Sequence, residues 1–525
     1  MSEPRPGPLP IVWSIAGSDS GAGAGIQADL RAFDTFDVHG CTAVAAITAQ
    51  NSVGVQRVEA VDTAWLDAQL ASLASDLAPR AIKTGLLGSV QNVRCVVEWV
   101  DRLRRERPLA LVVDPVWRAS TGDELSSAAL RDVLRGELLP RATAITPNRA
   151  EAAWLLGWDA AELADPDVVE RAAAALRALG PSAVVITGGD AAGAVSLDRL
   201  HAPQAQGWLG LARVDTRDHH GSGCVYAASM AAALALEFCT ADAAVIAKMS
   251  ATASLRAPSV AGRGAGAVRP QSGFGLDATL LPSLRTRANG TSGDFVPLRE
   301  PRLGLYAVVD SAAWVERVLA GGVRTVQLRV KHAHPDLLHA EVARAVHAAR
   351  QADAQLFVND HWQLAIEHGA YGVHLGQMDL PGADLQALRA AGVRLGVSTH
   401  SLWEVCRAVA LAPSYVACGP VHPTTTKDMP WRPQGPDNLA YWCALLRLPV
   451  VGIGGMDIAR SAQAVRCGAA GVAVVRGITE AASPEAAIRD FAATMAAASS
   501  APRWPAPRLP RSTLVEPAGP GRQAP

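Results

Sequence analysis

The sequence predicts an α/β protein with two domains: a mostly parallel sheet covered on both faces by helices, followed by a compact (β/α)₈ barrel. The chain has 525 residues, more than the roughly 250–300 residues that a single core usually accommodates. Apolar strand-like runs alternate with alanine-rich amphipathic stretches along most of it, and this alternation is typical of parallel sheets. In the second half, eight such runs follow one another, which is the number that a closed barrel needs.

Two stretches without apolar periodicity set the expected domain boundaries. One mixes Gly, Ser, Pro and Thr before residue 300, and the other is rich in Pro and ends the chain. Such compositions are typical of linkers and disordered segments. We expect an N-terminal arm over 1–10, a first domain over 11–268, a linker over 269–299, a barrel over 300–494 and a disordered tail over 495–525.

The first domain contains short apolar runs separated by stretches long enough for helices. Strands followed by helices predict a three-layer α/β/α arrangement. Near the end of the domain, residues 193–196 and 207–214 could form a hairpin, and a long helix is expected to start near Gly223. The expected parallel strands are 10–16, 41–48, 81–86, 109–113, 142–146 and 183–187.

The second domain gives a more regular count of strands and following helices. Eight βα units in about 195 residues predict a TIM barrel. An open parallel sheet remains the alternative. The eight expected strands are 303–310, 325–331, 355–360, 372–377, 394–400, 415–421, 450–455 and 471–477.

Composition excludes several functional classes. The 48 Lys+Arg and 49 Asp+Glu residues give a net charge of −1, so binding to a nucleic-acid backbone is not expected. The longest apolar run, 225–238, is shorter than the ~18 residues of a membrane span, and the first residues lack the pattern of a secretory signal. The eight cysteines form no CxxC pair. We expect a cytoplasmic enzyme with reduced thiols that acts on small molecules.

Polar residues or glycines lie at the carboxyl ends of the second to eighth strands of the expected barrel. Barrel enzymes carry their active sites at these strand ends. Positive side chains there suit a diphosphate, and paired carboxylates suit Mg²⁺. The glycine turn after strand seven and the backbone after strand eight fit a second, monophosphate group. A rim of unrelated salt bridges is the alternative interpretation. The residues at these strand ends are Gln327, Arg329, Lys331, Asn359, Asp360, Gln377, Asp379, Ser398, Thr424, Thr425, Thr426, Lys427, Gly455, Val475 and Arg476.

The barrel motifs are QLRVK, VND, HLGQMD, GVSTH, GPVHPTTTK, GIGG and VAVV. Over 303–478 they resemble thiamine phosphate synthase, which implies hydroxymethylpyrimidine diphosphate and thiazole phosphate as substrates. The resemblance assigns Asp360 and Asp379 to Mg²⁺, and charge stabilisation to Arg329, Lys331 and Lys427. The family usually has Ser where Arg476 stands. The implied diphosphate ligands are Gln327, Leu328, Arg329, Val330, Lys331, Asn359, Ser398 and Lys427. The implied thiazole-phosphate ligands are Thr424, Thr426, Gly455, Val475 and Arg476, and Thr425 between them is a further expected substrate-binding residue.

The strongest signal in the first domain is DHHGSGC at 218–224. Gly221, Ser222 and Gly223 would present backbone N–H groups at a helix start, which forms an anion hole for a phosphoryl group. At that helix N-terminus we expect Cys224 to have a lowered pKa and thiolate character. A glycine turn with a buried cysteine is the alternative. The glycine-rich turn at 16–30 has neither P-loop nor G-x-G-x-x-G spacing.

Two carboxylates follow expected strands of this domain. Asp114 ends LVVD, and Glu151 lies one turn into a helix after ITPN. Either could hold Mg²⁺ or its water shell, or could simply complement a helix N-terminus.

The motifs GAGIQADL, ITAQNSVGV, LVVDPVWRASTGDEL, ITPNRAEA and HGSGC resemble the ribokinase-like hydroxymethylpyrimidine/phosphomethylpyrimidine kinases over about 11–268. The resemblance implies that Gln50 binds the aminopyrimidine with Asp29 nearby. It implies that Asp114 and Glu151 serve Mg·ATP and that residues 221–224 form the anion hole. Thr187 occupies the ATP-side position where the family often has lysine, and Lys83 is a candidate replacement.

Together, the two resemblances imply a bifunctional enzyme of thiamine biosynthesis that uses ATP and Mg²⁺. The product of the first domain would be a substrate of the second. Two alternatives for the first domain remain: a pyridoxal-type vitamin kinase, or a non-catalytic binding module. The resemblance also suggests a homo-oligomer, and we expect no nucleic-acid or membrane partner.

Overall fold

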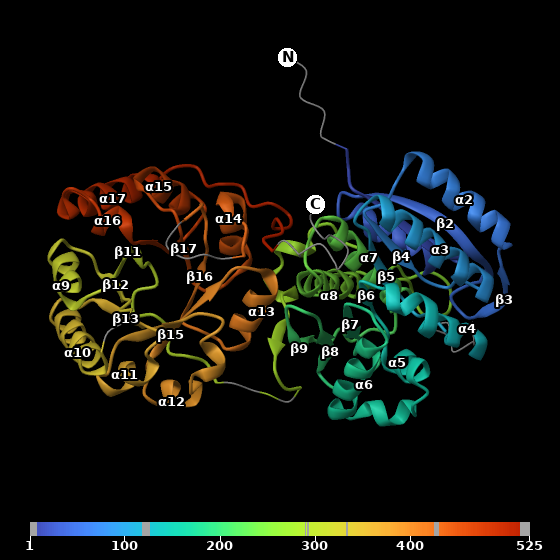
Figure 1. Ribbon diagram of the computed structural model, residues 1–525, viewed down its shortest axis with the longest axis horizontal. Coiled ribbons are helices and arrows are strands. Elements are labelled where there is room, and N and C mark those ends of the chain that lie inside the picture. The colour runs from blue at the N-terminus through green and yellow to red at the C-terminus, as the bar shows by residue number, and fades with distance from the viewer. Residues whose placement is uncertain are drawn as a thin grey trace, which may run out of the picture. The chain divides into compact units, whose positions relative to one another are not determined.

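The computed structural model describes residues 8–117, 127–288, 290, 293–331, 334–424 and 430–514. The chain divides into two compact units, one formed mainly by Met1–Gly290 and the other by Thr291–Val515. Figure 1 shows the first unit in blue to green and the second in yellow to red. Each unit is an α/β fold, as the sequence predicts, and each is described by itself.

The first unit is built on a ten-stranded sheet with the order β10-β9-β8-β7-β6-β5-β4-β1-β2-β3. Strands β2, β1, β4, β5, β6 and β7 run parallel, whereas β3 and the last three strands pair antiparallel. The hairpin expected near residue 200 is the β8–β9 pair. The strands are β1 (Ile11–Asp19), β2 (His39–Gln50), β3 (Val55–Ala60), β4 (Ala81–Thr84), β5 (Ala110–Val113), β6 (Ala144–Ile145), β7 (Ala183–Ile186), β8 (Val195–His201), β9 (Gln206–Ala212) and β10 (Ser283–Arg285).

Helices cover both faces of this sheet, so the predicted three-layer arrangement is confirmed. Successive residues of a strand point to opposite faces. Trp13 and Ile15 of β1 belong to the core that includes Leu66 of α2, whereas Ser14 donates a hydrogen bond to Asp29 of α1. The helices are α1 (Gly25–Asp34), α2 (Thr63–Asp76), α3 (Val90–Glu106), α4 (Ala128–Val133), α5 (Arg149–Leu156), α6 (Pro166–Ala178), α7 (Ser222–Ala235) and α8 (Thr240–Arg256).

The second unit is a closed parallel barrel in the order β11 to β18, and β11 pairs with β18. This closure excludes the open-sheet alternative. Its strands are β11 (Gly304–Val309), β12 (Thr325–Leu328), β13 (Gln355–Asn359), β14 (Gly372–Leu375), β15 (Arg394–Thr399), β16 (Tyr415–Cys418), β17 (Val450–Ile453) and β18 (Gly471–Val474). Its helices are α9 (Ala312–Ala320), α10 (Pro335–Gln351), α11 (Trp362–Glu367), α12 (Leu385–Ala390), α13 (Leu402–Ala410), α14 (Gly435–Leu445), α15 (Ile458–Arg466), α16 (Arg476–Thr479) and α17 (Pro484–Ala498).

The linker expected over 269–299 is corrected by the structure for much of its length. Ser283–Arg285 pair with β9 and extend the sheet. Phe274 is buried and its ring lies 5.4 Å from that of Phe36. A few apolar side chains among Gly, Ser and Pro are therefore enough to hold these residues to the first unit.

The tail expected to be disordered from residue 495 is also corrected. Helix α17 continues to Ala498, and Trp504 beyond it donates its backbone N–H to Arg466 at 2.9 Å. Thr513 is buried. Residues 515–525, and residues 1–7 of the expected N-terminal arm, lie outside the described residues. Within the described parts of the chain, no helix has the length and apolar character to cross a membrane.

Candidate active sites

A cavity of about 390 Å³ opens at the carboxyl ends of the barrel strands. The sequence-predicted residues that line it come from seven of the eight strand ends. The structure thus brings together Gln327, Arg329, Asn359, Asp360, Asp379, Ser398, Thr424, Gly455, Val475 and Arg476.

Some predicted barrel residues are not brought to this cavity. Leu328 is buried, Lys331 is exposed, and neither these two nor Val330 is part of the lining. Strand β12 ends at Leu328, so the alternation that would aim Lys331 inward does not extend that far. The predicted Thr425, Thr426 and Lys427 lie outside the described residues.

Asp360 and Asp379 form a carboxylate pair at the rim of the cavity. Burial, and then the charge of Asp379, raise the pKa of Asp360, against the opposing effect of Arg329. One oxygen of Asp360 accepts a hydrogen bond from Asn359 at 2.6 Å. Carboxylates that repel one another at a site open to ligand are a suitable donor set for a divalent cation, so these residues fit Mg²⁺.

A hydrogen-bonded chain crosses the barrel interior beneath the cavity, and the sequence reasoning missed most of it. It runs from the Gln327 amide to Tyr306 (3.3 Å), Tyr415 (2.8 Å), His374 Nδ1 (2.7 Å) and, from His374 Nε2, to Ser398 (2.8 Å). Burial lowers the pKa of His374 to about 4, so its ring is neutral. The alternation of β14 placed His374 inward, and this signal was available in HLGQMD.

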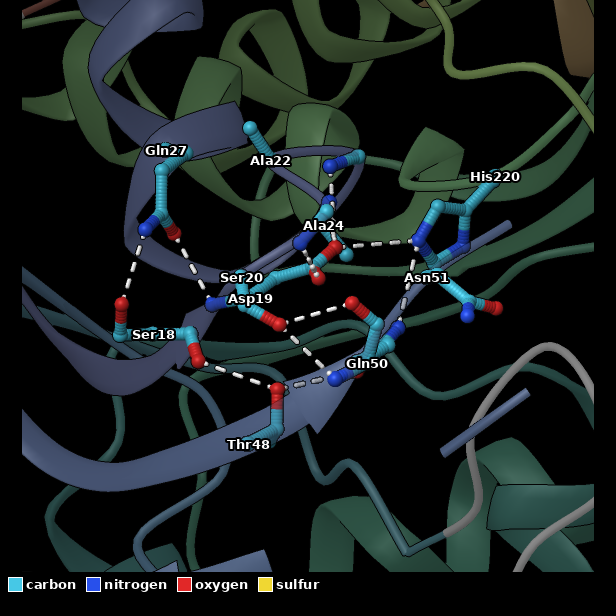
Figure 2. Close-up of polar contacts among 12 residues, drawn as sticks. Ser18, Asp19, Ser20, Ala22, Ala24, Gln27, Thr48, Gln50, Asn51 and His220 are labelled. Atoms are coloured by element: carbon cyan, nitrogen blue, oxygen red, sulfur yellow. Dashed lines mark hydrogen bonds and ion pairs between the residues drawn. The ribbon is translucent and has the colours of Figure 1, made fainter. Parts of the chain in front are cut away.

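In the first unit, a second cavity of about 480 Å³ is lined by a polar loop and by His220. Nε2 of His220 lies 3.2 Å from a carboxylate oxygen of Asp19 and 3.3 Å from the amide nitrogen of the predicted Gln50; Figure 2 shows these groups facing one another. Burial raises the pKa of Asp19, but hydrogen bonds from His220, Ala24 and Gly21 outweigh this effect and hold the pKa below its usual value. Neither Asp19 nor His220 was predicted. The other lining residues are Asn51, Ser52, Val53, Arg263, Gly264 and Ala265.

The predictions for Asp29 and Lys83 are corrected. Both side chains are fully buried and form an ion pair at 3.0 Å, and the Lys83 ammonium also lies 3.6 Å from Asp114. Asp29 is therefore not part of the cavity beside Gln50. Because its charge already serves two carboxylates in the interior, Lys83 is not a replacement for an ATP-binding lysine.

Asp114 and Glu151 are brought together, as predicted. Burial raises the pKa of Asp114 to about 6, and burial together with the Asp114 charge raises the pKa of Glu151 well above its usual value. Among the described residues, Oδ2 of Asp114 is buried without a hydrogen bond, and its nearest positive charge is the Lys83 ammonium at 3.6 Å. A buried carboxylate oxygen that makes no hydrogen bond, beside a second carboxylate, fits Mg²⁺. Glu151 also caps α5 through the backbone N–H of Asn148 at 2.8 Å.

The predicted anion hole forms the start of α7. Gly221 is its N-cap with φ +82°, and Ser222 and Gly223 begin the helix. The expected thiolate at Cys224 is wrong: burial, with Asp114 and Asp29 nearby, raises its pKa to about 12 although Lys83 opposes the shift. Burial outweighs both the helix N-terminus and Lys83, so Cys224 is a neutral thiol.

Thr187 lies at the same end of the sheet as the carboxylate pair of Asp114 and Glu151. It forms an isolated parallel bridge with Asn148, the N-cap of α5. Sequence reasoning missed the positive charges nearby: the charges of His219, Arg149 and Arg213 all act on Asp190, which follows Thr187 by three residues. Arg213 donates to the carbonyl of Gly189 at 2.6 Å.

The fold and the two sites fit two enzyme classes on one chain: a phosphotransferase-like α/β unit, and a barrel enzyme whose cavity carries a carboxylate pair beside an arginine. Family models agree with this division, since the phosphomethylpyrimidine kinase model matches residues 19–269 and the thiamine monophosphate synthase model matches residues 305–478. The chain belongs to the thiamine-phosphate synthase family. It is 51% identical over 200 residues to the thiamine-phosphate synthase of Neisseria meningitidis serogroup A, covering 38% of this chain and 97% of that one. It is 52% identical over 190 residues to that of Escherichia coli O9:H4, covering 36% and 90%.

Solved structures resemble the first unit. A Bacillus subtilis pyridoxal kinase in complex with ADP is 33% identical, with a TM-score of 0.47, and covers 50% of this chain and 98% of its own. The phosphomethylpyrimidine kinase of Clostridium difficile 630 is 31% identical, with a TM-score of 0.39, covering 46% and 96%. The family models confirm both resemblances that the sequence motifs carry.

Proposed function

We propose that this chain is a bifunctional enzyme of thiamine biosynthesis. Its first unit phosphorylates hydroxymethylpyrimidine, and then the monophosphate, with Mg·ATP. Its second unit joins the resulting diphosphate to thiazole phosphate and releases pyrophosphate. The observation that carries the proposal is the convergence of ten motif residues from distant strand ends on one barrel cavity that also contains a carboxylate pair.

In the barrel, the chain's own residues bind and orient the two substrates. Arg329 presents positive charge to the diphosphate, and Asp360 with Asp379 would hold the Mg²⁺ that neutralises it. Gly455, at the expected thiazole-phosphate pocket, has φ +63°, and a Cβ there would lie 2.6 Å from the Pro423 carbonyl oxygen, so the turn requires glycine. The bond between the exocyclic carbon and the diphosphate oxygen breaks, and the departing pyrophosphate takes the bonding electrons. The aminopyrimidine stabilises the positive charge left on that carbon, and the thiazole nitrogen captures it with its lone pair. Holding the nitrogen in line and stabilising the departing charge are the tasks that this geometry supports.

In the first unit, Gln50 and His220 orient the pyrimidine, and the start of α7 stabilises the phosphoryl group in transit. Asp114 and Glu151 would hold Mg²⁺ with the nucleotide. Arg149 and Arg213 supply positive charge at the edge where Thr187 stands. Phosphoryl transfer depends mainly on positioning and charge stabilisation, so one pocket can serve both phosphorylations.

The two alternatives for the first unit are less well supported. The matching family model is that of phosphomethylpyrimidine kinase, which favours the pyrimidine alcohol over pyridoxal. A binding module has no need for the repelling pair Asp114 and Glu151, which destabilises the unliganded fold. We further propose that the enzyme acts in the cytoplasm on small molecules.

One incubation tests the proposal. Purified full-length chain is given hydroxymethylpyrimidine, ATP, Mg²⁺ and thiazole phosphate, and thiamine phosphate is measured. We expect product only when all four are present. A parallel incubation with pyridoxal tests the alternative kinase. Failure to form product from added hydroxymethylpyrimidine diphosphate would contradict the synthase assignment, and failure only with the alcohol would contradict the kinase assignment.

A further inference from the structure

Residues 502–514 form an extended segment along the second unit, which we call the strap. The strap follows helix α17 and lies beyond residue 478, where the synthase family model ends. Its first part is anchored by Trp504, whose ring N–H donates to Asp437 at 2.8 Å and whose backbone N–H donates to Arg466 at 2.9 Å. Arg466 in turn donates to the carbonyl of Pro502 at 2.9 Å.

The middle of the strap is bonded to a buried asparagine of α14 and to the backbone of the residue that precedes the helix. Asn438 is almost completely buried and exchanges two hydrogen bonds with the backbone of Arg511, at 2.7 and 3.0 Å. The Arg511 guanidinium also donates to the carbonyl of Gln434 at 3.1 Å. Burying the Asn438 amide is favourable only when its hydrogen-bonding groups are satisfied, and the strap supplies two of their bonds.

Gln434 connects the strap to the wall of the barrel cavity. Its side-chain amide donates to the carbonyl of His400 at 2.6 Å, and its backbone N–H donates to Pro420 at 2.7 Å. Both His400 and Pro420 line the cavity. A single fully buried residue therefore contacts the strap on one side and two cavity-lining residues on the other.

The end of the strap reaches the same wall directly. The Thr513 hydroxyl donates to the carbonyl of His400 at 2.7 Å, and the Thr513 carbonyl accepts from the Arg432 N–H at 2.7 Å. Leu514 forms an antiparallel bridge with Trp431. The Trp431 ring stacks on the His400 ring, with centroids 5.4 Å apart and planes within 8°. The strap thus fixes both the backbone and, through Trp431, the ring of a cavity-lining residue.

We propose that the strap is a positioning element of the synthase site, with Thr513 acting through His400 and Arg511 acting through Gln434. Trp431 follows Lys427 by four residues in the chain, so the strap also fixes the chain just after the motif that the resemblance assigns to the diphosphate. The expected effect is on substrate binding: without the strap, the cavity wall at His400 and Pro420 loses its support. This inference rests on the proposed synthase function.

The test compares two shortened chains with the full-length protein. A chain ending at Ala501 lacks the strap, whereas a chain ending at Val515 keeps it. We expect the first to show a KM for hydroxymethylpyrimidine diphosphate that is raised at least tenfold, with unchanged kinase activity, and the second to behave as the full-length chain. Equal synthase KM and kcat in the two shortened chains would overturn the proposal.

Point variants separate positioning from folding. Thr513→Val removes one hydroxyl and keeps its shape, and we expect its KM to rise about fivefold to tenfold, the effect of one hydrogen bond, without a change in melting temperature. Arg508→Ala is the matched control, since Arg508 is exposed and has no hydrogen bond to any described residue. A lower melting temperature with unchanged KM in Thr513→Val would show a purely structural role and overturn the proposal.

Binding measured without turnover tests the proposed synthase function separately from the role of the strap. Calorimetric titration of the full-length chain with inorganic pyrophosphate and Mg²⁺ should show binding at the barrel site, weaker in the chain that ends at Ala501. No binding and no turnover by the full-length chain would overturn the proposed function and the inference with it. Equal binding by the full-length chain and the chain ending at Ala501 would overturn the inference alone.

Discussion

Replacing Gly221 by alanine tests the start of α7, the predicted anion hole. Gly221 has φ +82°, and a Cβ built on it would lie 2.1 Å from the carbonyl oxygen of Gly23. The left-handed conformation costs an alanine about 1–2 kcal/mol. The contact must also open by roughly 1 Å or more to reach an ordinary van der Waals distance, and overpacking of this kind costs about 1–3 kcal/mol. We expect Gly221→Ala to lower the stability of the first unit by about 2–5 kcal/mol and to abolish kinase activity.

The assay combines urea unfolding with two activity measurements on the same preparation. ADP release reports the kinase, and thiamine phosphate formed from added diphosphate reports the synthase, which should be unchanged. Gly136→Ala is the matched control, because Gly136 is exposed, has no positive φ, and its added Cβ would meet no atom within 4 Å; we expect it to be neutral or to stabilise by up to ~1 kcal/mol. A Gly221→Ala variant with wild-type stability and kinase rate would refute the reasoning.

Three further predictions concern the carboxylates and Gln50. Asp360→Ala should abolish the synthase and leave the kinase intact; an active synthase in coupled assays would contradict the metal assignment. Gln50→Ala should raise the kinase KM for the pyrimidine alcohol by about tenfold, the loss of one good hydrogen bond, with KM for ATP unchanged; an unchanged alcohol KM would remove this role. Because the pKa of Asp114 rises from 3.8 to about 6 on folding, the folded state binds this proton more tightly, so its stabilising contribution is full below pH 3.8 and is lost as the pH rises through 6. Thermal unfolding without Mg²⁺ should show this loss, and Asp114→Asn should lack it; the same slope in both proteins would contradict the assignment.

The sequence predicted the barrel and most of its site because the side chains of each short strand point alternately into and out of the barrel. That rule places Gln327 inside the barrel, and the ends of parallel strands share one rim. It fails for Lys331, which lies beyond the last residue of β12. The missed strand β10 has only three residues, too few to show a periodic pattern.

Charge states were harder to predict, because they depend on residues far apart in the chain. The helix N-terminus alone predicts a thiolate at Cys224, but burial in the assembled unit raises its pKa, and Asp114 and Asp29 from other elements add to that shift. Lys83 and Asp29 are 54 residues apart, and their pairing in the interior has no signal in either local sequence. Such contacts follow from the assembled sheet and not from any single motif.

The chain of hydroxyl groups beneath the barrel cavity has a direction. With the Gln327 amide nitrogen as donor to Tyr306, each later group accepts one hydrogen bond and donates one to the next group. Since a neutral imidazole has one N–H, His374 accepts at Nδ1 and donates at Nε2 to Ser398. The Ser398 hydroxyl thereby accepts from His374 and keeps its own hydrogen and one lone pair for a ligand, so the buried chain holds in place a group that can both donate to and accept from an incoming heterocycle.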